Sequence, residues 1–226
     1  MIRIGILGII FLVTGSFIPL IYVWVTSDSG LTIRTIHIQG GVHARDEELQ
    51  LYLSEFIGKS LYGTDLKRVQ KVAGQHPWVR SVRVRRQPPQ ALDVIVVERE
   101  ATALLKNHKL WVLDLHGVAF KAAETEEEFS LPQVSSPECV GVLEAHRRVS
   151  QPGGTIVQIE SSGANQFRVL FASGLEVLLG SQNWDEQWKK LVRVLNQLGN
   201  KRELLAFVYL DDTPKSNQIA VRFKKR

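Results

Sequence analysis

The side chains with the clearest potential for binding chemistry lie in HPWVRSVRVRRQPPQALDVIVVER, residues 76–99. Four of its arginines, Arg80, Arg83, Arg85 and Arg86, fall on one strand-like segment before a Pro-Pro break. Guanidinium groups gathered in this way can form a nucleic-acid surface, or a docking surface for an acidic partner or lipid headgroups. No aromatic residues interleave with them to stack on bases, which argues against nucleic acid. The simplest interpretation is solvated charge on a strand, with partner docking as the alternative.

The remaining reactive side chains form no recognisable catalytic or metal-binding pattern. The six histidines lack the spacing of metal ligands, and the sequence contains no nucleophile elbow, phosphate-binding loop or dinucleotide fingerprint. Asp211 and Asp212 are adjacent, so their carboxylates point apart on a strand or turn. His76 precedes a proline and is interpreted as a turn residue, and Cys139, the single cysteine, as a small residue in a loop or strand. We therefore predict no catalytic residues, no metal, no cofactor and no enzyme activity.

The first 30 residues predict a membrane anchor. Residues 4–25 carry no charge, and a helix of that length rises about 33 Å, enough to cross a hydrocarbon core of roughly 30 Å. Arg3 precedes this segment and Asp28 follows it, so residues 1–3 are predicted to be a cytoplasmic tail and the rest of the chain to lie outside the cytoplasm. A cleaved signal peptide is the alternative, but its apolar core is usually shorter.

Residues 31–99 show the pattern of a small β-α-α-β-β domain. A β-rich run ends at Gly40-Gly41, and a helix is expected over residues 46–57, followed by a second helix capped by Thr64. The apolar stripe of the first helix consists of Leu49, Tyr52, Leu53, Phe56 and Ile57. The arginine-rich strand and the strand over residues 91–98 then form a hairpin, in which Asp93 is a possible cross-strand partner for an arginine.

The remaining residues, 100–226, are richer in strands. Asp114 and Gly117 favour a type I turn inside a hairpin, and a short helix is expected over residues 142–149. Three strands precede the clearest helix, Trp184–Leu198, whose apolar residues recur on one face. Asn183 and Glu186 are interpreted as a capping box for that helix. Two final strands, LLAFVYL and QIAVRF, surround a polar loop. The mild net charge of +5 is compatible with several kinds of partner and selects none of them.

A set of short motifs occurs in a fixed order along the chain. They are IHIQGG (36–41), GKSL (58–61), TDL (64–66), HPWVRSVRVRR (76–86), LDVIVVER (92–99), LDLHGVAF (113–120) and LEVLLG (175–180), followed by the helix Trp184–Leu198 and the final strand pair. In this order they resemble the bacterial cell-division protein family FtsQ/DivIB over nearly the whole length. The resemblance implies an α+β protein with an N-terminal transmembrane helix, a β-α-α-β-β POTRA module over residues 31–99, and a second β-rich domain with one long helix over residues 100–226.

The resemblance also implies a function and partners. It predicts a non-enzymatic, single-pass scaffold of the divisome in the inner membrane, with its bulk in the periplasm and a location at the division septum. The POTRA module of such a protein supports recruitment, with FtsK-type or other division proteins as possible partners. The C-terminal strand accepts FtsB, itself in a coiled coil with FtsL. Asp211 and Asp212 stand where the family usually has a basic-aromatic pair, so no partner-binding residue is carried over from that pair.

The last strand offers a physical reason for partner binding. The predicted partner-binding residues are Gln218, Ile219, Ala220, Val221, Arg222 and Phe223. If this strand ends an open sheet, its outer N–H and C=O groups are unpaired and can template an added strand. The basic residues 224–226 would attract an acidic segment and discourage self-pairing. The alternative from sequence alone is an edge that this basic tail only protects.

Two further function classes remain open from the residues. An anchored envelope hydrolase would gather titratable groups from separate loops into a deep pocket. A component of outer-membrane assembly or secretion would use the POTRA module, but it usually needs several such modules or a long barrel. The residues that follow the first module are too few for a porin-sized barrel with its linkers.

Overall fold

The chain folds into two compact units, the first ending at Glu98 and the second beginning at Arg99. The computed structural model describes residues 31–44, 46–124, 130–162, 166–210 and 219–224. The predicted cytoplasmic tail and membrane helix lie outside these residues. The domain boundary predicted after residue 99 falls one residue beyond the observed division.

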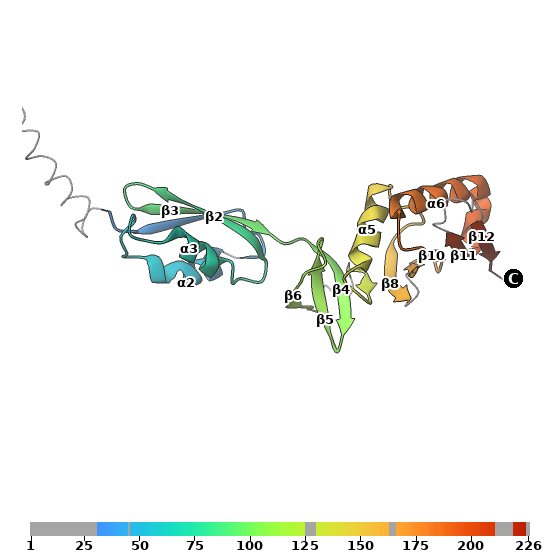
Figure 1. Cartoon of the computed structure of the whole chain (residues 1–226), viewed down its shortest axis with the longest axis horizontal. Helices are drawn as coiled ribbons and strands as arrows, with labels where there is room; N and C mark the ends of the chain where they lie inside the picture. Colours follow the sequence, from blue (N-terminus) through green and yellow to red (C-terminus); the bar gives the residue numbers. More distant parts are fainter. Residues whose placement is uncertain (1–30, 45, 125–129, 163–165, 211–218, 225–226) are drawn as a thin grey trace, which may run out of the picture. The chain divides into compact units, whose positions relative to one another are not determined.

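The first unit is a three-stranded sheet with two helices on one face (Figure 1). Its elements are β1 (Thr35–Gln39), α2 (Asp46–Leu53), η1 (Ser54–Phe56), α3 (Leu66–Ala73), β2 (Val79–Gln87) and β3 (Ala91–Glu98). The strand order is β1-β3-β2, with β1 parallel and β2 antiparallel to the central β3. The predicted β-α-α-β-β order is therefore confirmed, and both β1 and β2 lie at sheet borders.

The core of this unit follows most of the predicted apolar stripe. Leu49, Leu53 and Phe56 are fully buried against the sheet. Tyr52 and Ile57 do not belong to the core, since they remain 40% and 53% exposed. The α-helical spacing ends at Leu53 and a 3-10 turn follows, after which Ile57 is extended. The change of helical pitch therefore turns Ile57 away from the buried face.

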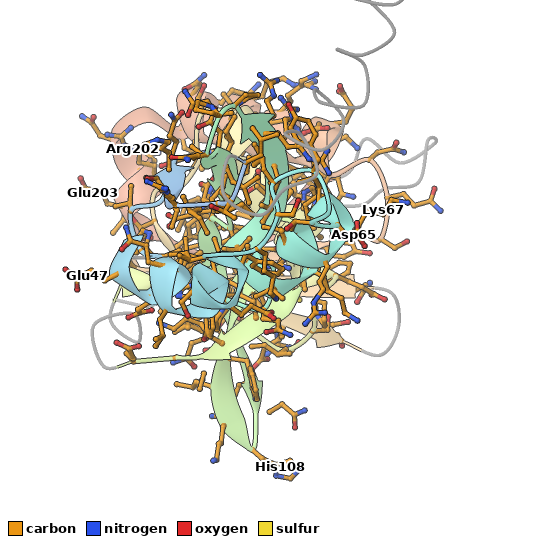
Figure 2. All side chains as sticks on the ribbon, turned by 90° about the vertical axis from the view of Figure 1, so that its left-hand side faces the viewer. Glu47, Asp65, Lys67, His108, Arg202 and Glu203 are labelled. Carbon is orange, nitrogen blue, oxygen red and sulfur yellow. The ribbon has the colours of Figure 1, made fainter. Side chains whose placement is uncertain are left out.

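The cap predicted for α3 was wrong by one residue. Asp65 is the N-cap, and its carboxylate accepts a hydrogen bond from the Lys67 N–H at 2.9 Å (Figure 2). Thr64 is instead buried, and its hydroxyl donates to the Ser60 carbonyl at 2.7 Å. The threonine therefore closes the preceding turn, and the aspartate satisfies the free N–H of the helix.

Among its described residues, the second unit consists of a nine-stranded sheet and two α-helices. Its strands are β4 (Ala101–Asn107), β5 (Lys109–Asp114), β6 (Ala119–Ala122), β7 (Gln133–Val134), β8 (Ile156–Ser162), β9 (Gln166–Phe171), β10 (Glu176–Leu179), β11 (Leu205–Leu210) and β12 (Ile219–Phe223). The helices are α5 (Cys139–Arg148) and α6 (Trp184–Leu198), and the 3-10 helix η2 (Gly199–Leu204) follows α6. The strand order is β12-β11-β10-β9-β8-β7-β4-β5-β6. The sheet therefore ends at β12 on one side and at β6 on the other.

Helix α6 has the predicted bounds and carries the largest buried side chain of this unit. Trp188 is fully buried, and its indole N–H donates to the Val142 carbonyl of α5 at 3.2 Å. The predicted capping box was wrong, because Asn183 adopts a left-handed conformation with φ of 54° and makes no side-chain cap. Helix α5 begins earlier than predicted, and Cys139 is a buried helix residue, not one in a loop or strand.

Two adjacent residues at the boundary between the units each bind a loop of their own unit. Glu98 Oε1 accepts hydrogen bonds from the backbone N–H groups of residues 42, 43 and 44 at 2.8, 2.9 and 2.6 Å. Arg99 donates to Asp114 Oδ2 at 2.6 Å, at the predicted turn. Asp114 Oδ1 also accepts from the N–H groups of His116 and Val118 at 2.9 and 3.0 Å. Each carboxylate thus closes a loop of its own unit.

These hydrogen bonds set the charge state of both carboxyl groups. Burial alone would raise the pKa of Glu98, but the hydrogen bonds from Ala44, Val42 and His43 outweigh it and lower the pKa. For Asp114, burial is likewise outweighed by the hydrogen bonds from the backbone and from Arg99, so its pKa is also lowered. Both groups are therefore ionised at neutral pH and stabilise their loops as anions.

We predict that Glu98→Gln loosens the loop over residues 42–44. The amide can accept the same hydrogen bonds but lacks the charge, so the loop should lose about 1–2 kcal/mol. Hydrogen exchange of these backbone amides should accelerate by roughly 5–30-fold. Glu47→Gln is the matched control, since Glu47 is an exposed glutamate of α2 (Figure 2). Equal exchange in both variants would contradict the role of Glu98.

The same variant gives a pH signature. Because the folded pKa of Glu98 lies below its ordinary value, its stabilisation is complete above the ordinary value and disappears as the pH falls through the folded pKa. The difference between wild type and Glu98→Gln should therefore shrink on acidification. A difference that is constant from neutral to acidic pH would show that the charge is not responsible.

Candidate functional site

Strand β12 forms one border of the nine-stranded sheet. It pairs antiparallel with β11, and the register places Val221 opposite Val208 and Ile219 opposite Leu210. In the order of the described strands, β11 is its sole neighbour. The strand that the sequence singled out therefore has one side without a strand partner.

The alternation of a strand indicates which backbone groups face that open side. Lys224, directly after β12, donates its N–H to the Leu204 carbonyl at 2.8 Å, toward the side of β11. Backbone groups alternate sides with a period of two, so Ala220 and Arg222 also direct theirs toward β11. The N–H and C=O groups of Ile219, Val221 and Phe223 then face outward. This border is the template that an added strand requires.

The side chains of β12 divide between core and surface. Ile219 is half-buried and packs against the core, and the next four residues are exposed. Val221 and Phe223 are each 41% exposed and present apolar surface on this strand. The guanidinium of Arg222 lies 5.5 Å from the centre of the Phe207 ring on β11. Gln218 lies outside the described residues, as do Lys225 and Arg226.

Arg80, Arg83, Arg85 and Arg86 lie on β2, a border strand of the smaller sheet. Arg80, Arg83 and Arg85 are exposed. The register places Asp93 of β3 directly opposite Arg85, as the sequence suggested. No ion pair joins the two side chains in the described part of the chain. These three arginines thus form an exposed basic border.

Arg86 is placed differently from the other three. Its side chain lies on the same face of β2 as that of Val84, a buried residue, and Arg86 is itself half-buried. Its guanidinium donates to the carbonyls of Leu61 at 2.8 Å and Thr64 at 2.9 Å. Arg86 therefore secures the loop before α3. The sequence held a signal for this placement, because Arg86 has the same strand parity as Val82 and Val84.

Two of the described histidines are buried, one in each unit. His76, predicted to be a turn residue, is buried, with Nε2 2.9 Å from a Glu48 oxygen. His146 is buried in the second unit, where burial lowers its pKa and keeps the imidazole neutral. Among the described residues, no three histidine, cysteine, aspartate or glutamate side chains cluster as a metal site would require. The described helices also include none with the length and apolarity of a membrane span.

Comparison with known proteins accounts for both units. The sequence-family model of the FtsQ-type POTRA domain matches residues 31–99 of this chain. The family model of the FtsQ/DivIB C-terminal domain matches residues 103–211. The chain belongs to the FtsQ/DivIB family of cell-division proteins. The resemblance drawn from the ordered motifs is thereby confirmed, and with it a role in cell division.

Similar curated proteins extend over most of the chain. Cell division protein FtsQ of Shewanella oneidensis is 27% identical over 214 residues, covering 90% of this chain and 81% of that protein. FtsQ of Anaeromyxobacter is 28% identical, with 87% and 73% covered. FtsQ of Myxococcus fulvus is 24% identical, with 88% and 76% covered. The similarity to the FtsQ family thus spans both units.

We predict that Arg86→Ala destabilises the POTRA unit, whereas Arg83→Ala does not. Removing the Arg86 guanidinium leaves two backbone carbonyls without their charged donor, at a cost of about 1–2 kcal/mol. Urea unfolding and hydrogen exchange of residues 61–64 measure this effect. Arg83→Ala is the matched control, because it removes an exposed arginine from the same strand. If both variants unfold at the same urea concentration, Arg86 has no special structural role.

Proposed function

We propose that this chain is a membrane-anchored scaffold of the divisome that captures a partner by strand addition at β12. The observation that carries the proposal is the open backbone border of Ile219, Val221 and Phe223. Membership of a cell-division family supplies the biological setting. The proposed partner is an extended segment of FtsB, which the family resemblance implies is itself in a coiled coil with FtsL.

Strand addition divides affinity and selectivity between two sets of groups. Outward N–H and C=O groups bind any extended backbone, so they contribute affinity without regard to sequence. The exposed apolar side chains of Val221 and Phe223 lie on this strand and can pack against alternate residues of the added strand. Arg222 and Lys224 favour a partner with acidic residues. The partner is therefore an extended segment with alternating apolar and acidic side chains.

The basic residues also protect the edge when it is empty. An exposed strand with large apolar side chains invites pairing between identical copies. Two copies of β12 would bring Arg222 and Lys224 of each chain close together, and like charges oppose that contact. An acidic partner strand meets the same charges favourably. Selectivity thus arises from repulsion of the wrong strand as well as attraction of the right one.

The exposed arginines of β2 are proposed as a second docking surface on the POTRA module. Arg80, Arg83 and Arg85 carry positive charge along a border strand, which suits an acidic segment of an FtsK-type or other division protein. Arg86 is excluded from this surface because its donors are directed to the loop before α3. Nucleic acid remains disfavoured, since the segment lacks stacking aromatics.

The membrane placement is proposed from the uncharged segment over residues 4–25. A single span with the amino terminus in the cytoplasm places both described units in the periplasm, at the inner membrane and the division septum. Both β12 and the arginines of β2 would then meet partners outside the cytoplasm.

We predict that Val221→Pro abolishes capture of the FtsB–FtsL coiled coil. Proline removes an N–H that faces the open border, and its ring obstructs an incoming strand. The ladder to β11 should survive, because the N–H groups directed toward β11 belong to Ala220 and Arg222. Binding of purified full chain to the coiled coil should weaken by at least about tenfold.

Val221→Ala is the matched control, since it keeps the N–H and loses only side-chain area. This variant should bind with a loss of less than about tenfold. Hydrogen exchange of β10 and β11 checks that the proline variant stays folded. Capture by Val221→Pro at wild-type strength would refute strand addition at this edge.

We further predict that a reporter enzyme active only outside the cytoplasm works when fused after Arg226. The charge asymmetry around residues 4–25 directs the carboxyl-terminal bulk across the membrane. Deleting residues 4–25 should make the same fusion inactive. An inactive fusion on the full-length chain would overturn the proposed topology.

A further inference from the structure

The second unit carries a groove on its helical side, away from the strand borders discussed above. It has a volume of 570 Å³ and lies against α6, η2 and the loop that follows α5. Its apolar wall is formed by Val149, Val192 and Leu195, and its cations are Lys189, Arg193 and Arg202. The groove falls within the size range of binding sites for small ligands and peptide side chains.

The apolar wall exists because α6 has more apolar surface than the core covers. Trp188 and Leu191 are fully buried beneath the helix. Val192 is only half-buried and does not belong to the core cluster of the described residues, although it continues the apolar stripe. Leu195 is also half-buried and lines the groove.

The rim of the groove carries three cations, Lys189, Arg193 and Arg202. Arg193 and Arg202 are exposed, and neither makes an ion pair within the described part of the chain. Figure 2 labels Arg202 and the next residue, Glu203. Lys189 is paired with Glu186 at 2.7 Å on the helix surface. The residues lining this groove include no carboxylate. The rim therefore favours an anionic ligand, and its two arginines are the available donors.

The wall opposite α6 is held in place by the core. His146 is 3% exposed and donates from Nε2 to the Pro152 carbonyl at 2.9 Å. The Gln151 N–H donates to the His146 carbonyl at 3.1 Å. These bonds tie the loop after α5 to the buried histidine. Because these hydrogen bonds hold the wall in place, little ordering is required on binding.

The groove continues into a second hollow of 320 Å³ that shares Leu195 and Arg202 with it. The second hollow reaches Ser173 and Leu205, at the start of β11. The lining of this hollow also includes Glu203. Its Ser173 accepts a hydrogen bond from Lys224, and its Leu205 pairs with Phe223 of β12, so only the first groove is proposed as the site.

We propose that this groove binds an acidic amphipathic helix of another protein. Apolar side chains on one face of such a helix would contact Val192 and Leu195, and flanking carboxylates would pair with Arg193 and Arg202. This surface is separate from β12 and does not depend on strand addition. It gives the second unit two independent sites for protein partners.

The test uses the detergent-solubilised full chain and a fluorescent designed peptide. The peptide is an amphipathic helix of about 18 residues with leucine at positions i, i+3, i+4 and i+7 and glutamate on the flanks. Fluorescence anisotropy should detect binding that weakens with added salt. The double variant Arg193→Glu, Arg202→Glu should weaken binding at least about tenfold. Val192→Ser should weaken it several-fold through the apolar wall.

The matched control reverses two charges elsewhere in the same unit. Lys106→Glu, Lys109→Glu changes the net charge equally at the β4–β5 hairpin, beside His108 at its tip (Figure 2), and should leave peptide binding unchanged. Val221→Pro should also leave it unchanged, which separates the groove from β12. The proposal would be overturned if the peptide did not bind, or if the control pair weakened its binding as much as the groove variant does. Loss of peptide binding in Val221→Pro would also overturn it. The proposal would also be overturned if binding of anionic vesicles required Arg193 and Arg202 while binding of the peptide did not.

Discussion

Backbone N–H and C=O groups require hydrogen-bond partners, and the border of β12 leaves those of Ile219, Val221 and Phe223 facing outward. A closed barrel would have satisfied them internally, whereas this nine-stranded sheet ends in an open strand. The rest of the second unit holds that border in position. Trp188 joins α6 to α5, and Ile219 attaches β12 to the core beneath them. The proposed capture of a partner depends on this rigid, incomplete edge.

The two units are built separately and joined by two residues of contrasting charge. Glu98 gathers three backbone N–H groups of the POTRA unit, and Arg99 binds Asp114 of the second unit. Because each bond stays inside its own unit, either domain can keep its loop closed independently of the other. Separate folding units suit a scaffold that presents several surfaces to several partners.

Local sequence patterns predicted most of the elements, whereas the open border of the last strand was a condition that the family resemblance favoured. The bounds of α6 followed from its apolar period and Gly199, and the turn at Asp114 followed from its residue types. The residue that caps a helix N-terminus was less predictable, because neighbouring polar residues such as Thr64 and Asp65 can both accept hydrogen bonds from the first N–H groups of the helix. The parallel pairing of β10 with β11 joins distant segments, so no local pattern contained it. The groove beside Val192 was missed because periodicity shows an apolar face but not how much of it a neighbour covers.

The most direct test of the account is residue-resolved hydrogen exchange of β12 in the full chain, with and without the FtsB–FtsL coiled coil. In the free chain, the amides of Ala220 and Arg222 should be protected by β11, and those of Val221 and Phe223 should exchange rapidly. Addition of the coiled coil should protect Val221 and Phe223. Rapid exchange at Val221 and Phe223 in the bound state, or protection of both before the partner is added, would contradict an open edge that a partner strand completes.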